Sequence, residues 1–421
     1  MHVVIVDEEL PFPPTSGKRI RILSLARHLA KRHRMTFLCH RNADRDEARE
    51  AAEHLASCGI EALTVDRQSD AKAGRLPRLR FGARMALNLL SPVPYSVQWN
   101  ACPRLREAVR RYQGEHAADI WQCEWAPYAT TLLEMQGIRW AMMAHDIQSF
   151  TWERYYRNES NPLKRWYIKK QWERYRRYEK RVFSAAPMTI TVTAEDEQRA
   201  REHFSAGTTA VVDNGVDVAH YRAASQQQIV RKPAEILFLG NLEWRPNLDA
   251  VRLLLDEVFP VVLAAEPSAR LCIVGRRPPA WLQRRGREGA NVEVHADVAD
   301  VRPFLYRCGA MAVPLRIGGG SRLKILEALA CGLPVVASTV GAEGLRLQPG
   351  VHFTSADQTA DMARTLIEWI RNPAPALAKA EAGRAVVESR YDWSVLAEKM
   401  EQAWEELLAQ RPPTRILVPC G

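Results

Sequence analysis

The sequence predicts an α/β protein of two similar halves, each built on a parallel sheet with connecting helices. Three observations support this. Short apolar runs alternate with amphipathic helical segments, which is typical of parallel sheets with crossover helices. A polar stretch at 223–233, with three consecutive glutamines, interrupts this alternation and is the best linker candidate. The length of 421 residues also exceeds that of one ordinary domain.

The composition excludes disordered and fibrous proteins, because 47% of the residues are apolar and 26% are charged. No apolar run approaches the roughly 20 residues that span a bilayer, and the N-terminus lacks the apolar core of a secretory signal. We therefore expect a cytoplasmic protein that is not integral to a membrane. The eight cysteines have no zinc-ligand spacing, so we expect reduced thiols and no metal site.

Apolar periodicity indicates where the individual elements lie. In the first half we expect strands at 3–6, 35–39, 140–144 and 188–192, and helices at 22–30 and 44–56. In the second half we expect strands at 235–239, 270–274, 292–295, 310–315 and 334–337, and helices at 248–258, 301–307, 321–330 and 395–408. Open α/β sheets bind ligands at the carboxyl ends of their strands, so two such halves predict a ligand cleft between them.

The stretch 314–338 carries the strongest indication of a binding site. A predicted strand runs into three glycines at 318–320 and then into a helix, so backbone N–H groups and the positive helix end can face a phosphate. Arg322 and Lys324 add positive charge there. Glu327 lies about one turn further along, where a carboxylate can accept hydrogen bonds from two ribose hydroxyls. The alternative is an exposed ion pair between Lys324 and Glu327 beside a simple turn.

These residues resemble the nucleotide-sugar signature of family-four glycosyltransferases of the GT-B fold. Residues 326–336 are similar to the family pattern LEAMACGxPVV, and 214–217 with Tyr221 are similar to NGVDxxxF. The resemblance covers essentially the whole chain. It implies two Rossmann-like domains facing a cleft, at 1–210 and 211–392, with a C-terminal helix at 393–410 that crosses back to the N-terminal domain.

The resemblance also implies an activity. The chain would be a glycosyltransferase of the hexosyltransferase type that moves a sugar from a UDP- or GDP-sugar to a glycan or polyprenyl-linked acceptor in the biosynthesis of surface polysaccharides or glycoconjugates. Transfer would retain the anomeric configuration and need no metal or other cofactor. The donor-binding residues would be Gly319, Gly320, Ser321, Arg322, Lys324, Glu327, Arg245 and Asn247.

On the N-terminal side, His145 follows a predicted buried strand and matches the family's cleft histidine, so it would be catalytic. Gly17 and Lys18 resemble the loop that faces the cleft. A structural histidine and a simple tight turn are the alternatives at these two places. The single D-x-D pattern, Asp44-Arg45-Asp46, lies at a predicted helix start and is interpreted as a solvated surface.

One departure from the family pattern leaves other functions open. The family's first carboxylate lies eight positions before the second, and Gly319 stands at that place. Sugar contacts would then come from backbone N–H groups or other side chains. The alternatives are a non-catalytic protein of the same fold that binds sugar nucleotides or lipids, and a sugar-nucleotide epimerase.

Much of the net charge of +10 is concentrated at 150–183, which holds eleven lysines and arginines, four glutamates and ten of the 33 aromatic residues. One interpretation is a helix whose aromatic side chains pack on the N-terminal domain while its lysine and arginine side chains reach solvent. Another is peripheral contact with the inner face of a membrane, or with a lipid-linked acceptor. Arginines and aromatics also suit nucleic acid, but no motif resembles an RNA- or DNA-binding module, so we expect no nucleic-acid partner.

Overall fold

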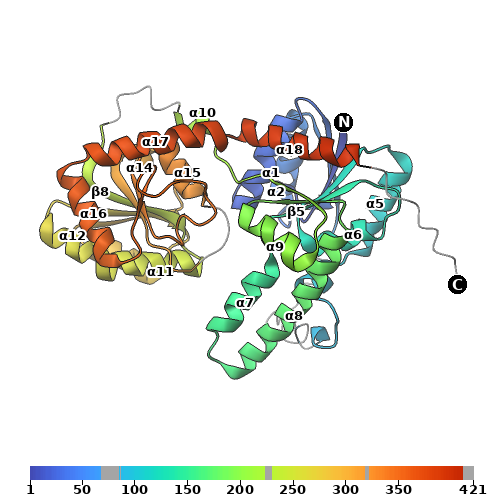
Figure 1. Cartoon of the computed structure of the whole chain (residues 1–421), viewed down its shortest axis with the longest axis horizontal. Helices are drawn as coiled ribbons and strands as arrows, with labels where there is room; N and C mark the ends of the chain where they lie inside the picture. Colours follow the sequence, from blue (N-terminus) through green and yellow to red (C-terminus); the bar gives the residue numbers. More distant parts are fainter. Residues whose placement is uncertain (68–84, 86, 223–229, 318–321, 411–421) are drawn as a thin grey trace. The chain divides into compact units, whose positions relative to one another are not determined.

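The computed structural model describes residues 1–67, 85, 87–222, 230–317 and 322–410 (Figure 1). The chain divides into two compact units, one of Met1–Asp213 with the C-terminal segment from Leu396, and one of Asn214–Val395. Residues 223–229 of the expected linker and the glycines at 318–320 lie outside the described residues. In the described part of the chain, no helix is both long enough and apolar enough to cross a membrane.

The N-terminal unit contains a parallel sheet whose described strands have the order β3-β2-β1-β4-β5-β6-β7. The expected strands at 3–6, 35–39, 140–144 and 188–192 are confirmed as β1, β2, β5 and β6, and β3, β4 and β7 are additional. The strands are β1 (His2–Asp7), β2 (Arg34–His40), β3 (Ile60–Val65), β4 (Ile120–Cys123), β5 (Trp140–Ala144), β6 (Met188–Thr191) and β7 (Thr208–Val211).

Helices connect these strands, and side-chain caps fix where several of them begin. The helices are α1 (Gly17–Leu29), α2 (Arg45–Ser57), α4 (Tyr95–Asn100), α5 (Pro103–Glu115), α6 (Thr130–Leu133), α7 (Gln148–Asn158), α8 (Pro162–Ala185) and α9 (Ala194–Phe204). Asp44 caps α2 by accepting from the Glu47 N–H, and Asn161 caps α8 immediately before Pro162. Figure 1 shows α7 and α8 leaving the body of the unit as an adjacent pair.

The C-terminal unit contains a second parallel sheet, whose described strands have the order β10-β9-β8-β11-β12-β13. All five strands expected here are confirmed. They are β8 (Lys232–Asn241), β9 (Arg270–Arg276), β10 (Val292–Ala296), β11 (Cys308–Val313) and β12 (Val335–Ala337), with β13 (Thr354–Ser355) at the edge. The helix expected at 248–258 is instead α11 (Arg245–Leu253) followed by a π-helical turn, Leu254–Val258.

The remaining helices complete both units. In the C-terminal unit they are α10 (Val218–Arg222), α12 (Phe259–Ala265), α13 (Ala280–Glu288), α14 (Arg302–Arg307), α15 (Leu323–Ala330), α16 (Thr359–Arg371) and α17 (Ala374–Arg390). The last helix, α18 (Trp393–Ala409), follows α17 in the chain but packs from Leu396 onward in the N-terminal unit. The expected return of the C-terminal helix to the N-terminal half is therefore confirmed.

Candidate functional site

In the C-terminal unit, the carboxyl end of β8 meets the first turns of α11 and α15. Asn247, in α11, donates from Nδ2 to the Asn241 carbonyl at 2.8 Å, and its Oδ1 accepts from Lys324 Nζ at 2.9 Å. Gly240 permits this contact, because a Cβ there would lie 2.9 Å from both the Asn247 amide and Lys324 Nζ. The end of β8 and the start of α11 thus hold the Lys324 ammonium group, which comes from a helix 77 residues further along the chain.

Lys324 is half-buried, and its ammonium group lies 4.8 Å from the centre of the Phe238 ring. Burial lowers the pKa of Lys324 to about 7, the charge of Arg322 acts in the same direction, and Glu327 opposes both. Lys324 forms no salt bridge with any residue that the structure describes. An anionic ligand at this edge would therefore stabilise the charged form of Lys324 and gain affinity from it.

Glu327 lies on α15 one turn beyond Lys324, as the helical spacing predicts, and the Tyr221 hydroxyl of α10 interacts with its carboxyl group. Burial raises the pKa of Glu327, while Tyr221 and Lys324 oppose that increase. Tyr306 Oη of α14 in turn donates to the Tyr221 carbonyl at 2.7 Å, which fixes the short helix α10 against α14. A carboxyl group held in this way can accept hydrogen bonds from hydroxyl groups of a ligand.

The two arginines expected to bind the donor lie in different surroundings. Arg322, at the N-cap of α15, is 4% exposed and donates to the Val340 carbonyl at 2.8 Å, with Glu343 at 3.7 Å. Arg245 begins α11 and is exposed, two positions before Asn247. Gly319, Gly320 and Ser321 lie outside the described residues. Arg322 thus supports the loop after β12, whereas Arg245 is accessible to a ligand.

In the N-terminal unit, Asp7, Glu124 and His145 lie at the carboxyl ends of β1, β4 and β5. These three strands are neighbours in the sheet, and His145 Nε2 lies 3.0 Å from Glu124 Oε2. Gly17 and Lys18 open α1 after the N-cap Ser16, and Lys18 pairs with the buried carboxyl group of Asp7. The structure therefore brings His145 and Lys18 to the same sheet edge.

Glu124 controls the electrostatics of this edge. Burial opposes ionisation of Glu124, but hydrogen bonds from His145 and Gln122 and the charge of Arg21 together lower its pKa below the usual value. The Glu124 side chain is 5% exposed, and that of His145 is 15% exposed. A buried carboxylate bonded to one ring nitrogen fixes the orientation of an imidazole and leaves its other nitrogen for a ligand. This pair can therefore hold or move a proton at His145.

Three residues of these edges were not predicted as site residues. Glu124 follows a four-residue strand that the sequence pattern does not reveal, and Asp7 ends β1 beside it. Tyr221 belongs to the NGVDxxxF-like segment, so that motif was the signal that could have placed it beside Glu327. Contacts of this kind depend on strand order, which apolar periodicity does not specify.

One group of potential metal ligands occurs among the described residues, and it lies away from both edges. The side chains of Glu235, Cys272 and Cys308 come together near the amino ends of β8, β9 and β11. The Arg307 guanidinium already lies 3.1 Å from Cys272 Sγ and 2.5 Å from Glu235 Oε2. This cluster is thus neutralised by an arginine and takes no part in the sites described above.

Comparison with known proteins gives a match to each half of the chain. A family model described as Glycosyltransferase Family 4 matches residues 15–220, and one described as Glycosyl transferases group 1 matches residues 233–372. Among curated proteins, glycogen synthase of Mycobacterium tuberculosis is 28% identical over 227 residues, which are 51% of this chain and 53% of that protein. Phosphatidyl-myo-inositol mannosyltransferase of the same organism is 30% identical over 225 residues, 51% of this chain and 58% of that protein. The matched region spans about half the length of these curated relatives.

Solved structures show the same architecture at low sequence identity. Sucrose-phosphate synthase from Thermosynechococcus elongatus is similar with a TM-score of 0.67 at 16% identity, over 97% of this chain and all of that chain. Anabaena Alr3699/HepE in complex with UDP-glucose has a TM-score of 0.60 at 14% identity, over 96% of this chain and all of that one. WaaG, a glycosyltransferase involved in lipopolysaccharide biosynthesis, has a TM-score of 0.60 at 15% identity, over 97% of this chain and all of that one. Given the two family matches, the two parallel-sheet units and the solved structures of the same architecture, the chain belongs to the family 4, group 1 glycosyltransferases and has the GT-B fold.

Proposed function

We propose that the chain transfers a sugar from a nucleoside diphosphate sugar to a glycan or lipid-linked acceptor. The observation that carries this proposal is the pair of ligand groups on α15. Lys324 is held at the end of β8 by Asn247, and Glu327 lies one turn further along against Tyr221. A cation followed by a carboxyl group at this spacing suits a diphosphate followed by a ribose.

The proposed reaction replaces the diphosphate oxygen at the anomeric carbon with an acceptor oxygen, and the acceptor hydroxyl loses its proton. Lys324 and the exposed Arg245 would stabilise the charge that develops on the leaving diphosphate, without a metal. Glu327 would hold the ribose. We further propose that the anomeric configuration is retained, in keeping with the family that the sequence resembles.

In the N-terminal unit, we assign His145 to hydrogen bonding or proton transfer at the transferred sugar or the acceptor. Its support is the buried Glu124 carboxylate 3.0 Å from His145 Nε2. The names of the relatives bear on the substrates: one transfers mannose to phosphatidyl-myo-inositol, and one solved neighbour holds UDP-glucose. We therefore expect a UDP- or GDP-sugar as donor and an acceptor in glycoconjugate biosynthesis.

The test is to incubate the protein with a panel of UDP- and GDP-sugars, with and without a membrane lipid extract, and to measure released nucleoside diphosphate. We expect release from one donor in the presence of an acceptor. Glu327→Ala should weaken donor binding, measured by thermal shift. The exposed Glu288→Ala in the same unit should leave it unchanged. Donor binding without release under every condition would contradict transfer.

A second candidate function follows from Gly319, which stands where the family pattern has its first carboxylate. A protein without that group could bind a sugar nucleotide without transferring the sugar, or could convert it into an epimer. The same incubation distinguishes these cases, since an epimerase changes the sugar while it is still attached to the nucleotide. A non-catalytic protein would bind the donor and change nothing.

We also propose that α7 and α8 contact an anionic membrane surface. Tyr155, Leu163 and Trp166 are 54%, 81% and 51% exposed on these helices, among exposed lysines and arginines. Each cation near an anionic bilayer contributes on the order of 1 kcal/mol. The protein should sediment with phosphatidylglycerol vesicles, less with phosphatidylcholine vesicles, and less after Leu163→Ala with Trp166→Ala. Equal recovery with both kinds of vesicle, or no effect of the double change, would contradict this contact.

A further inference from the structure

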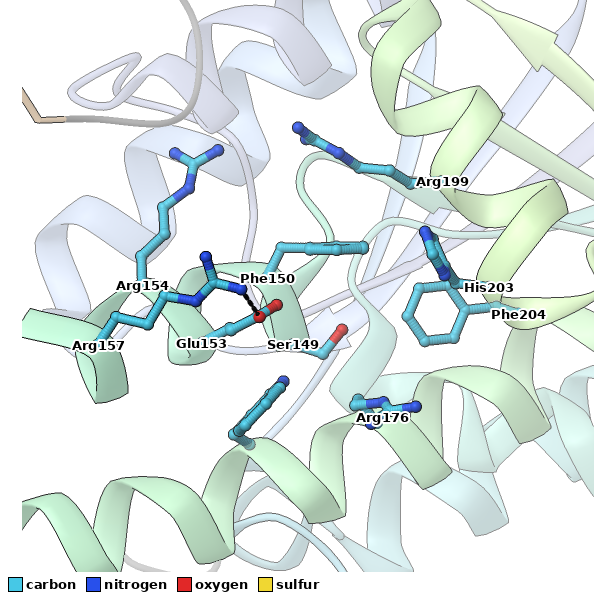
Figure 2. Close-up of a pocket in the computed structure, with 10 residues that line it drawn as sticks. Ser149, Phe150, Glu153, Arg154, Arg157, Arg176, Arg199, His203 and Phe204 are labelled. Carbon is cyan, nitrogen blue, oxygen red and sulfur yellow. Dashed lines mark hydrogen bonds and ion pairs between the residues drawn. The ribbon is translucent and has the colours of Figure 1, made fainter.

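A pocket in the N-terminal unit lies among α7, α8 and α9. Its volume is 560 Å³. Four arginines line it: Arg154 and Arg157 from α7, Arg176 from α8 and Arg199 from α9. Figure 2 shows Arg154 and Arg199 reaching into the pocket from opposite sides, with Arg176 below them. Arginines from three separate helices therefore converge on one space.

Fewer carboxylates than arginines line the pocket. Glu153 is the one carboxylate among its lining residues, and it pairs with Arg157. Arg199 forms an ion pair at 2.9 Å with Asp196, which does not line the pocket. Arg176 forms no ion pair with any residue that the structure describes, and its guanidinium lies 6.0 Å from the Trp172 ring. Arg176 therefore brings to the pocket a positive charge that no described carboxylate pairs with.

Aromatic side chains line the pocket beside the arginines. The Phe150 ring lies 5.1 Å from the Arg199 guanidinium and 5.5 Å from the His203 ring. Trp172 is held by stacking on Tyr156, with ring centroids 5.6 Å apart. A ring that covers one face of a guanidinium group leaves the N–H groups at its edge able to donate to an anion.

We propose that this pocket binds a phosphate-bearing ligand, with a diphosphate as the best fit. A guanidinium group donates two parallel hydrogen bonds to phosphate oxygens, and a diphosphate has enough oxygens to engage arginines on more than one helix. Its source could be a soluble diphosphate or the headgroup of a lipid, and the chemistry of recognition is the same. Binding at this pocket needs no sugar transfer, so the proposal stands apart from the function proposed above.

Adjacent arginines on α8 provide the test. Arg176 and Arg177 are both exposed and carry the same charge, but only Arg176 lines the pocket. Binding of inorganic pyrophosphate would be measured by calorimetry at constant ionic strength in a Lys324→Met background, which weakens the donor site. We expect saturable binding that Arg176→Ala weakens about tenfold and Arg177→Ala changes less than twofold. The absence of saturable binding, or equal losses in the two variants, would overturn the proposal.

Two further measurements locate the site and identify the source of the ligand. Tryptophan fluorescence should change on pyrophosphate binding, and Trp172→Phe should remove that change; a change that survives in this variant would place the ligand elsewhere and overturn the proposal. Vesicles containing polyprenyl diphosphate would then be compared with vesicles of equal charge made with phosphatidylglycerol. If Arg176→Ala weakens binding to the polyprenyl diphosphate vesicles but not to the phosphatidylglycerol vesicles, the ligand is carried by a lipid. If Arg176→Ala weakens binding of inorganic pyrophosphate alone, the ligand is soluble.

Discussion

Lys324 is the residue whose charge state should control donor affinity. Burial lowers its pKa to about 7, so it is charged below pH 7 and increasingly neutral above it. UDP affinity should therefore fall as the pH rises from 6 to 8.5, because binding must then supply a proton to Lys324. Lys324→Met should weaken UDP binding at pH 6 by at least about tenfold and remove this component of the pH dependence. Calorimetric titration at several pH values measures both effects.

The control for Lys324 is Lys379→Met, a half-buried lysine in the same unit that donates to Thr354. UDP's own ionisation increases its charge as the pH rises and persists in every variant, so the comparison isolates the lysine. A wild-type protein whose UDP affinity has the same pH profile as that of Lys324→Met would show that Lys324 does not carry the charge in question.

Glu124 is expected to act through His145. Glu124→Gln keeps a hydrogen-bonding group beside His145 Nε2, where the Glu124 carboxylate lies at 3.0 Å, but removes its negative charge. We expect turnover to fall at least about tenfold, with UDP affinity unchanged, since Glu124 belongs to the N-terminal unit. Steady-state rates and UDP titration separate the two effects. Glu134→Gln, a partly exposed glutamate of the same unit, is the control. Unchanged turnover in Glu124→Gln would restrict the pair to a structural role.

Among the elements, the start of α7 depends on a buried carboxyl group from α8. Glu179 is fully buried and accepts from the Gln148 and Ser149 N–H groups at 2.6 and 3.0 Å. Burial raises the pKa of Glu179 to about 8, so the folded protein holds a proton that the unfolded chain loses near pH 4. Stability from this group is therefore greatest at low pH and is lost as the pH rises toward 8.

The unfolding free energy of the N-terminal unit should consequently fall by about 2 kcal/mol between pH 6 and pH 8. Urea unfolding at both pH values measures this, and Glu179→Gln should flatten the dependence. Glu173→Gln, on the same helix and paired with Lys170, should not. If wild type and Glu179→Gln lost the same free energy over this range, the proton would not reside on Glu179.

At the level of elements, the sequence predicted more of the fold than of the site. Apolar runs identify strands because a parallel strand is buried on both faces, and every expected strand is present. The short strand β4 was not predicted, and the role of Glu124 at its end was therefore not predicted either. The spacing of Lys324 and Glu327 on one helix was also readable from periodicity. The contacts of these two residues with Asn247 and Tyr221 were not predicted, because a contact such as that of Lys324 with Asn247, across 77 residues, depends on strand order and register.

For the whole molecule, the C-terminal helix raises the question of whether the two units are stabilised independently. Trp404 of α18 is fully buried in the N-terminal unit, and its Nε1 donates to Gln122 Oε1 at 2.7 Å. Glu401, one turn earlier, pairs with His33 at 2.7 Å and with Arg32 at 2.8 Å. The N-terminal unit thus takes part of its core from residues that follow the entire C-terminal unit in the chain.

Trp404→Ala should therefore destabilise the N-terminal unit by about 3–5 kcal/mol and lower its Tm by roughly 10 °C. UDP should still raise the Tm of the C-terminal unit in this variant, because a ligand stabilises only the unit that binds it. Scanning calorimetry with and without UDP tests both statements, and the exposed Trp166→Ala is the matched control. If Trp404→Ala abolished the shift caused by UDP, the donor site would depend on the docking of α18, and the two units would have to be treated as one cooperative structure.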